Sequence, residues 1–374
     1  MKRILHIVSA MDRGGAETLI MNIYRNIDRS KVQFDFVTHS EKVDDYDVEI
    51  KLLGGRIFKT ESLGSVGPFK YTNNLVKIIS STTYEVVHVH TDFQCGFPAL
   101  AARLSGVQNR ICHSHSTNWL KNNGPINGLI FKALQGLIKW NATKLCSCSE
   151  EAAAFLFGKK SIEYNKVKIL KNSIDISGYM NMGNDIRSSV IEEFDLSPKV
   201  KLLGHVGKFS ESKNQKFILK VLKKVVEKDS NYVAIFVGDG PLRETIELEA
   251  RAMDLMDHVK FIGVREDISR LMKSFDIFLF PSIFEGFGIV MLEAQSAGTP
   301  CLASTAVPKT VDLGLGLVGF ISIDNTEEQW KEAILSQSSS KAINPKEVEK
   351  QIRYKGFHID DNVNEWMNLY GLQA

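Results

Sequence analysis

The sequence predicts an α/β fold made of two Rossmann-like domains that face each other across a cleft. Short apolar runs rich in β-branched residues alternate with amphipathic stretches along the chain, which is the pattern of repeated β-α-β units with parallel sheets. The series starts again near Lys201. A chain of 374 residues is also too long for one ordinary hydrophobic core. Ligands usually bind such sheets at the carboxyl ends of their strands, so we expect the functional residues there.

The first domain is expected over residues 1–172. Its apolar runs predict strands at residues 4–8, 32–37, 86–89 and 110–112. Helical spacing is found near residues 18–27, 75–79 and 98–104. Residues 125–144 form a further amphipathic pattern with lysines beside its apolar face. This pattern fits either a core helix or a helix that lies on an anionic membrane.

The second domain is expected over residues 198–357, after a polar interdomain linker at 173–197. Its apolar runs predict strands at residues 202–206, 233–237, 259–262, 277–280 and 301–303. Helices are expected at residues 217–226, 243–252 and 290–297. A last helix within residues 358–374 has Trp366 and Tyr370 on one face, and we expect it to pack back on the first domain.

The charge is unevenly distributed, although the net charge is only +2. Residues 1–172 carry 23 basic and 15 acidic residues, and the remainder carries 23 basic and 29 acidic residues. A basic first half favours an anionic partner, either a phosphate-bearing acceptor or an anionic membrane surface. We find no signal peptide, no apolar run of roughly 18 residues and no nucleic-acid recognition motif. The expectation is a cytoplasmic protein that binds no nucleic acid, with peripheral contact at the inner face of the cell membrane as a further option.

No metal site is expected. The five cysteines lack CxxC spacing. A zinc site of Cys146 and Cys148 with His113 and His115 is one interpretation, but small buried thiols in a reducing cytoplasm are the preferred one. The Asp45-Tyr46-Asp47 triplet matches a metal-binding DxD pattern, yet it lies in an acidic run without a preceding strand. We interpret it as a solvated helix start.

In each domain, a glycine-containing loop follows the first strand. Gly14 and Gly15 lack a Cβ and precede a helix, so they either let a phosphate approach the helix N-terminus or form a tight turn. In the second domain Gly207 and Lys208 follow the strand, and Lys213 comes shortly after. Two cations beside a helix start suit a diphosphate and would stabilise a leaving nucleotide, whereas the alternative is a pair of solvated surface lysines.

The strongest signal is the stretch FPSIFEGFGIVMLEAQSAGTPCLAS. A strand runs into a turn with Glu285, Gly286 and Gly288, and the following helix carries Glu293. Carboxylates accept hydrogen bonds from vicinal hydroxyls, so one suits a sugar and the other a ribose. The backbone amides from Phe287 to Ile289 would lie at a phosphate between them.

These motifs resemble those of the family 4 retaining glycosyltransferases with the GT-B fold, in particular bacterial enzymes of capsular and exopolysaccharide biosynthesis. The resemblance covers nearly the whole chain. It is carried by GGAETLIMNIYR, ILKNSIDISGY, HVGKFSESKN, VGDGPLR, FIGVREDISRLMKSFDIFLFPS and PSIFEGFGIVMLEAQSAGTP.

The resemblance implies a role for each motif residue. Glu285 contacts the transferred sugar, Glu293 binds the ribose hydroxyls, and Lys208 and Lys213 bind the diphosphate. Lys208 stands where many members have arginine, which keeps the charge but loses the bidentate fork. Gly15 approaches the phosphate from the first domain.

The same resemblance places a histidine of RICHSHST beside the donor sugar. His115 is the matching residue, but His113 lies on the same face of an extended strand and is the alternative. His90 is a candidate substrate contact or a structural histidine. Asn172 lies in KNS, where the family has PNG, so the turn there is expected to differ.

The resemblance also implies stereochemical retention without a metal ion or other cofactor. The donor is expected to be a UDP-sugar and the acceptor a glycan or polyprenyl-linked oligosaccharide. In a front-face route the donor's own phosphate would accept the acceptor proton. The alternatives are a sugar-nucleotide 2-epimerase of the same architecture and a catalytically silent partner subunit.

Overall fold

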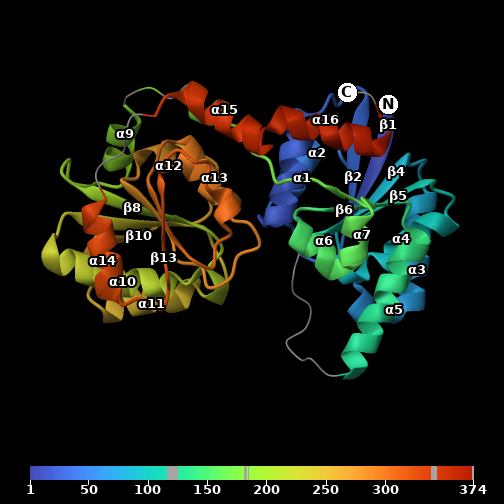
Figure 1. Ribbon diagram of the computed structural model, residues 1–374, viewed down its shortest axis with the longest axis horizontal. Coiled ribbons are helices and arrows are strands. Elements are labelled where there is room, and N and C mark those ends of the chain that lie inside the picture. Colours follow the sequence, from blue (N-terminus) through green and yellow to red (C-terminus); the bar gives the residue numbers. More distant parts are fainter. Residues whose placement is uncertain (116–124, 181–182, 184, 338–342, 373–374) are drawn as a thin grey trace. The chain divides into compact units, whose positions relative to one another are not determined.

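The computed structural model describes residues 1–115, 125–180, 183, 185–337 and 343–372, which form two compact units (Figure 1). Unit 1 comprises Met1–Ser173 and Ile359–Ala374, and unit 2 comprises Ile174–His358. Each unit contains one parallel sheet with helices on both faces. The expected architecture of two Rossmann-like domains is therefore confirmed.

Within its described residues, unit 1 contains a seven-stranded parallel sheet in the order β3-β2-β1-β4-β5-β6-β7. Its strands are β1 (Lys2–Ile7), β2 (Val32–Thr38), β3 (Ile57–Lys59), β4 (Val86–Val89), β5 (Asn109–Ser114), β6 (Lys144–Ser147) and β7 (Val167–Ile169). Its helices are α1 (Gly15–Asn26), α2 (Asp47–Leu52), α3 (Leu63–Ser80), α4 (Gly96–Leu104), α5 (Pro125–Asn141), α6 (Glu150–Phe157), α7 (Lys159–Glu163) and α16 (Ile359–Tyr370), with a 3-10 turn η1 (Asp92–Gln94).

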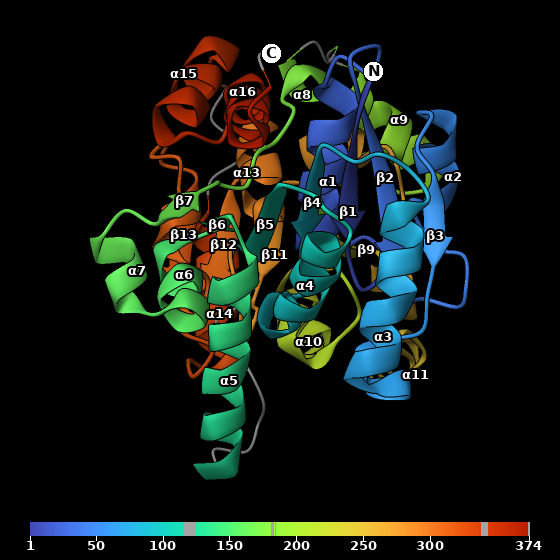
Figure 2. The same ribbon diagram turned by 90° about the vertical axis from the view of Figure 1, so that its right-hand side faces the viewer.

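Side chains alternate between two hydrophobic layers along the strands of unit 1. Ile4 packs with α1 and α16 on one face, and its neighbour Leu5 packs with α3, α4 and α6 on the other. Figure 2 shows α3 and α4 in front of this sheet and α1 behind it. The C-terminal helix α16 places Trp366 and Tyr370 in the first layer, which joins the end of the chain to unit 1.

Within its described residues, unit 2 contains a six-stranded parallel sheet in the order β10-β9-β8-β11-β12-β13. Its strands are β8 (Lys201–Val206), β9 (Tyr232–Val237), β10 (Val259–Phe261), β11 (Ile277–Phe280), β12 (Cys301–Ser304) and β13 (Val318–Ile321). Its helices are α8 (Ser177–Met180), α9 (Ile186–Glu193), α10 (Gln215–Lys228), α11 (Arg243–Ala252), α12 (Ile268–Ser274), α13 (Ile289–Ser296), α14 (Glu327–Ser336) and α15 (Pro345–Lys355). Short 3-10 turns are η2 (Glu211–Lys213), η3 (Met256–His258) and η4 (Lys309–Val311).

The segment expected as a linker contains a packed helix. Val190 of α9 is fully buried in a core layer of unit 2. Arg187 donates to the carbonyl oxygens of Ser274 and Val200 and to Asp276. The polar appearance of this segment therefore reflects the exposed face of a short amphipathic helix.

The strands that the sequence did not predict include the short edge strands β3, β7 and β13. None of the strands β3, β7 and β13 has a fully buried residue, and β3 and β7 have only three residues each. An edge strand is covered on fewer sides, so it needs no continuous apolar run. Among the described helices, none combines the length and the apolar character that a membrane crossing requires.

Candidate active site

In each sheet the strand order reverses at one point, between the first and the fourth strand of the unit. In unit 2 the central neighbours are β8 and β11, and in unit 1 they are β1 and β4. Loops leave two such strands in opposite directions and open a crevice at their carboxyl ends, where ligands bind in open α/β sheets. The motif residues of unit 2 follow β8 and β11.

Lys213 and Glu285 lie together in unit 2, although 72 positions separate them in the chain. The Lys213 ammonium forms an ion pair with Oε2 of Glu285, and the two side chains are only 18% and 15% exposed. The Lys213 Nζ also lies 4.7 Å from the ring centroid of Phe280, and Ser282 Oγ donates to Glu285 Oε2 at 3.4 Å. Contacts on several sides therefore hold the cation and the carboxylate in place.

The other residues of the loop after β8 are more open. Lys208 has an exposed side chain, and its carbonyl oxygen accepts a hydrogen bond from Gln215 Nε2 at 2.9 Å. A Cβ on Gly207 would lie 3.6 Å from Cδ of Lys213. A Cβ on Gly238, in the loop after β9, would collide with the carbonyl oxygen of Gly207, so the two loops touch through their backbones.

The turn between β11 and α13 depends on glycine. Gly288 is the N-cap of α13 with φ 85° and ψ 61°, a left-handed conformation that side chains rarely adopt. A Cβ there would also lie 3.0 Å from the Phe280 ring. Gly286 is exposed with open space where a Cβ would be, and Phe287 is half-buried with its ring 5.2 Å from that of Phe357. The amides of Ile289 and Val290 at the start of α13 lack partners within the helix and can bind an anion, whereas the Met291 amide donates to the Gly288 carbonyl oxygen.

Glu293 lies on α13 among buried neighbours, and it is itself partly exposed. Burial raises the pKa of its carboxyl group to about 7. Burial and the nearby Glu293 charge raise the pKa of the Tyr179 hydroxyl well above its ordinary value. Glu293 is therefore poised to change protonation when a ligand supplies hydrogen-bond donors.

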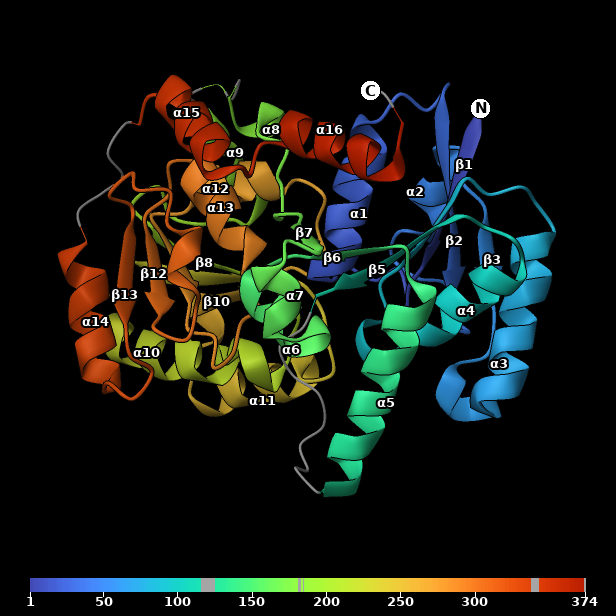
Figure 3. The same ribbon diagram turned by 45° about the vertical axis from the view of Figure 1, so that its right-hand side comes forward.

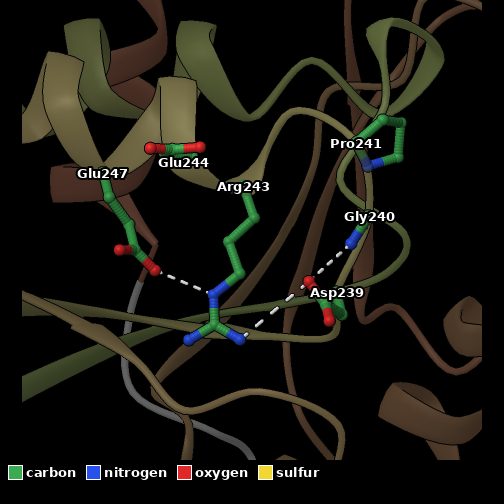
Figure 4. Close-up of a pocket in the computed structure, with 6 residues that line it drawn as sticks. All are labelled: Asp239, Gly240, Pro241, Arg243, Glu244 and Glu247. Carbon is green, nitrogen blue, oxygen red and sulfur yellow. Dashed lines mark hydrogen bonds and ion pairs between the residues drawn. The ribbon is translucent and has the colours of Figure 1, made fainter.

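A polar pocket of about 440 Å³ lies at the carboxyl end of β9 (Figure 4). Arg243 is one of its lining residues, and its Nε donates to Glu247 at 2.8 Å while its guanidinium is 4.0 Å from Asp239. The pocket is lined by Asp239, Gly240, Pro241, Arg243, Glu244 and Glu247. Four of these residues belong to the VGDGPLR motif, so this motif presents both charge signs to a polar ligand.

In unit 1 the acidic run at residues 41–49 accepts hydrogen bonds from the backbone of the glycine loop. Asp44 accepts a hydrogen bond from the backbone amide of Met11 at 2.9 Å, and Asp45 accepts one from that of Arg13 at 3.1 Å. Asp47 is 2% exposed, so the expectation of a solvated helix start was wrong for this residue. The preceding loop is folded onto the run, because the Tyr46 amide also donates to the Met11 carbonyl.

The two glycines of this loop differ. A Cβ on Gly14 would collide with the carboxylate of Glu17, whereas nothing lies within 4 Å of the position of a Cβ on Gly15. Gly15 is the first residue of α1 and Gly14 is its N-cap. The open space at Gly15 leaves its amide accessible to an anion.

The candidate histidines lie at the carboxyl ends of β4 and β5. His113 is fully buried, His90 is 7% exposed, and His115 is partly exposed. The side chain of His90 bonds to that of His115 at 2.9 Å, and the backbone amide of His115 donates to Asp92 at 2.8 Å. His115 is therefore the more accessible of the two residues that the sequence left as alternatives.

Asn172 is half-buried just before the end of the first segment of unit 1. The following Ser173, which replaces the family's glycine, is fully buried, and its carbonyl oxygen accepts from Asn22 Nδ2 at 3.1 Å.

Cys146 is buried with its Sγ 3.5 Å from His88 Nε2, and His113 Nδ1 is 3.2 Å from the same atom. The buried cysteine thus lies among histidines of the neighbouring strands.

The sequence did not single out three residues that contact the candidate groups, namely Phe280, Ser282 and Asp92. Phe280 and Ser282 stand within the FPSIFEG turn, so their closeness to Glu285 was a usable signal. Asp92 follows His90 in the chain, but only the pairing of β4 with β5 brings it to the amide of His115.

Two family models match the chain one after the other. The model described as Glycosyltransferase Family 4 matches residues 13–177, and the model described as Glycosyl transferases group 1 matches residues 187–357. The putative glycosyltransferase EpsF of Bacillus subtilis is 39% identical over 374 residues, which are 100% of this chain and 97% of that protein. The chain belongs to glycosyltransferase family 4.

This glycosyltransferase also resembles the Escherichia coli UDP-Gal:alpha-D-GlcNAc-diphosphoundecaprenol alpha-1,3-galactosyltransferase, with 24% identity over 79% of this chain and 78% of that one. The crystal structure of Anabaena Alr3699/HepE in complex with UDP-glucose matches it with a TM-score of 0.77 and 18% identity over 100% of both chains. The structural likeness confirms the GT-B fold. Which residues of this glycosyltransferase bind the donor stays a prediction.

Proposed function

We propose that this glycosyltransferase moves a sugar from a nucleoside diphosphate sugar to a glycan or polyprenyl-linked oligosaccharide during cell-surface polysaccharide biosynthesis. The ion pair of Lys213 and Glu285 at the switch between β8 and β11 carries the proposal. A cation beside a carboxylate suits a ligand whose diphosphate adjoins a hydroxylated sugar. The names of the E. coli relative and of the Anabaena complex both include a UDP-sugar, which favours UDP as the nucleotide.

Each motif residue then has a defined task. Lys208 and Lys213 bind the diphosphate and stabilise the negative charge that develops on the leaving nucleotide. Glu285 accepts hydrogen bonds from hydroxyls of the transferred sugar, and Glu293 accepts them from the ribose. The amides at Gly286, Phe287, Gly288 and Ile289 lie beside the phosphates, as does that of Gly15. His115 binds the donor sugar.

We further propose a metal-independent reaction with retention at the anomeric carbon. Two lysines supply positive charge of the kind that a divalent ion supplies to other phosphate sites. In a front-face route the donor phosphate accepts the proton of the acceptor hydroxyl, which then bonds to the anomeric carbon as the bond to the leaving diphosphate breaks. The anomer of the product, read by NMR, tests this route, and inversion would refute it.

The central test is Glu285→Gln, which keeps the shape of the side chain and removes its charge. We expect kcat/KM to fall by about 10²- to 10³-fold, because a preorganised contact to the reacting sugar is weakened. The melting temperature should stay near that of the parent, and Glu211→Gln is the matched control because Glu211 is an exposed acid in the same region.

Three further readouts separate the alternatives. Thermal shifts with UDP-, GDP- and ADP-sugars identify the nucleotide through the stabilisation that binding brings. Donor conversion without acceptor would indicate a 2-epimerase, and no binding of any nucleotide would indicate a silent subunit. Normal turnover by Glu285→Gln would remove the site assignment.

We also propose that α5 contacts an anionic membrane surface, where a polyprenyl-linked acceptor resides. One face of α5 packs into unit 1 through Ile138, which is fully buried. On the opposite face Leu129 is 72% and Trp140 is 70% exposed, and Lys132 and Lys139 flank them with exposed side chains. Figure 3 shows the first turns of α5 extending beyond the sheet of unit 1. An apolar stripe with basic flanks is the pattern of an interfacial helix.

A further inference from the structure

A hydrogen-bonded row of three imidazoles crosses the sheet of unit 1. His6 of β1 lies beside His90, which follows β4, and His90 lies beside His115, which follows β5. His6 Nδ1 is 3.0 Å from His90 Nε2, and His90 Nδ1 is 2.9 Å from His115 Nε2. The row starts at a fully buried residue and ends at a partly exposed one. It therefore links the core of unit 1 to the carboxyl edge of its sheet.

All three imidazoles are neutral near pH 7. Burial lowers the pKa of His6 to about 3 and that of His115 to about 4, and burial with the neighbouring histidines lowers the pKa of His90 well below its usual range. A neutral imidazole has one N–H donor and one acceptor nitrogen. Each contact in the row joins one N–H donor to one acceptor nitrogen. The three N–H groups must therefore all point in the same direction along the row.

The buried end of the row decides that direction. Among the described residues, no group forms a hydrogen bond with His6 Nε2, which is enclosed in the core. Its surroundings are aromatic, since the rings of Phe34 and Phe36 are 4.3 and 5.5 Å away. An unpaired buried N–H is rarer in proteins than an under-used acceptor. His6 therefore carries its proton on Nδ1 and donates it to His90.

The remaining protons follow from this one. His90 Nε2 accepts from His6, so the His90 proton is on Nδ1 and is donated to His115 Nε2. His115 Nε2 accepts, so the His115 proton is on Nδ1 as well. Among the described residues, no hydrogen bond occupies this Nδ1–H, and His115 is partly exposed.

We propose that His90 is a positioning residue that holds His115 as an N–H donor with no basic nitrogen left for the acceptor proton. The inference rests on the proposed function, in which His115 binds the donor sugar. His115 then donates from Nδ1 to an oxygen of that sugar. It cannot act as the general base, so the proton of the acceptor hydroxyl has to go to another group, such as the donor phosphate.

A metal site is the main competing explanation for the cluster, because ligand atoms of His90, His113 and His115 lie within 4.8 Å of one another. The rings of His113 and His115, however, stack with centroids 4.0 Å apart at 27°. The lone pair of an imidazole lies in the plane of its ring. Two nearly parallel, stacked rings do not direct their lone pairs at one ion, so the geometry favours the hydrogen-bonded row.

The test compares His90→Asn with His90→Gln in the full chain. The amide nitrogen of asparagine can take the place of Nδ1 and keep a donor toward His115, whereas that of glutamine takes the place of Nε2 and loses it. The ¹⁵N NMR signals of the histidines, assigned by single substitutions, report the tautomer of His115. His205 is an internal reference, because its Nδ1 lies 2.9 Å from the Leu279 carbonyl oxygen, which can only accept.

We expect His115 to show the Nδ1–H tautomer in the parent and in His90→Asn, and a mixture in His90→Gln. We expect kcat to fall roughly tenfold in His90→Gln and much less in His90→Asn, as for the loss of one hydrogen bond. An Nε2–H tautomer in the parent overturns the proposal, as do equal kcat losses in both variants. A metal ion that stays bound to these histidines through chelation also overturns it. The tautomer is read without substrate, so its outcome is distinguishable from failure of the proposed function, which would be seen as no binding of any nucleotide.

Discussion

Glu285 and Glu293 belong to one motif but have different surroundings. Glu285 is paired with Lys213, whereas burial raises the pKa of Glu293 to about 7. The fold therefore pairs one acid of the motif with a cation and leaves the other partly protonated near pH 7. A pair of acids that the environment sets apart can serve different hydroxyl groups of one ligand.

The pKa of Glu293 predicts how stability depends on pH. The pKa in the folded chain, about 7, lies above the ordinary value of 4.5, so the folded state holds the proton more tightly. This contribution to stability is fully present below the ordinary pKa and is lost as pH rises through about 7. Glu293→Gln cannot ionise and should lose less unfolding free energy than the parent over this range.

Urea denaturation at several pH values measures this difference. We expect it to be on the order of 2 kcal/mol, which discounts the full pKa shift because Glu293 is partly exposed. Parallel stability curves for the parent and Glu293→Gln would contradict the prediction.

At the scale of elements, α5 has two apolar faces. One contains Ile138 and is packed into unit 1, and the other contains Leu129 and Trp140 and is exposed. A helix in water normally has one apolar stripe, so a second exposed stripe needs an explanation. The basic residues beside it, Lys132 and Lys139, point to an anionic surface.

Vesicle binding tests this interpretation of α5. We expect the parent to sediment with anionic phosphatidylglycerol vesicles and less with neutral phosphatidylcholine vesicles. Lys132→Glu together with Lys139→Glu should reduce binding to the anionic vesicles, at about 1 kcal/mol per basic residue removed. Lys199→Glu, at an exposed lysine of unit 2, is the control. Equal binding of the parent and the α5 variant would refute membrane docking through this helix.

At the scale of the whole molecule, each unit has its own hydrophobic layers. Trp366 is fully buried in unit 1, and Trp330 is 1% exposed in a core layer of unit 2. Unit 1 is built from both ends of the chain, because Ile359–Ala374 belongs to it. The last segment of unit 1 therefore follows the whole of unit 2 in the sequence.

Calorimetry should detect two unfolding transitions. Trp366→Phe should lower only the transition of unit 1, and Trp330→Phe only that of unit 2, each by a free energy on the order of 2 kcal/mol from the cavity left behind. UDP should raise the transition of unit 2 more than that of unit 1, because most of the proposed nucleotide contacts belong to unit 2 and a ligand stabilises the residues that bind it. A single transition that both variants shift equally would show that the chain unfolds as one cooperative body.

Much of the fold could be predicted because its central strands are locally encoded. The run Ile277–Phe280 is apolar at every position and is buried on both faces, and the expected bounds of this strand match β11. The Glu285 turn was also recognisable, since Gly288 has the left-handed backbone that only glycine adopts readily. Edge strands such as β3 escaped prediction because their side chains are only partly buried, and the helix α9 did so because it buries a single residue, Val190.

The sequence by itself determined the order of the central strands, the position of the glycine turns and the acids of the main motif. These features depend on residues close together in the chain. Tertiary structure alone decided that Lys213 meets Glu285, that Asp44 and Asp45 brace the first glycine loop, and that His6, His90 and His115 form one row. Such contacts depend on crossovers that place β4 beside β1 and β11 beside β8, and no local pattern of residues records which strands become neighbours.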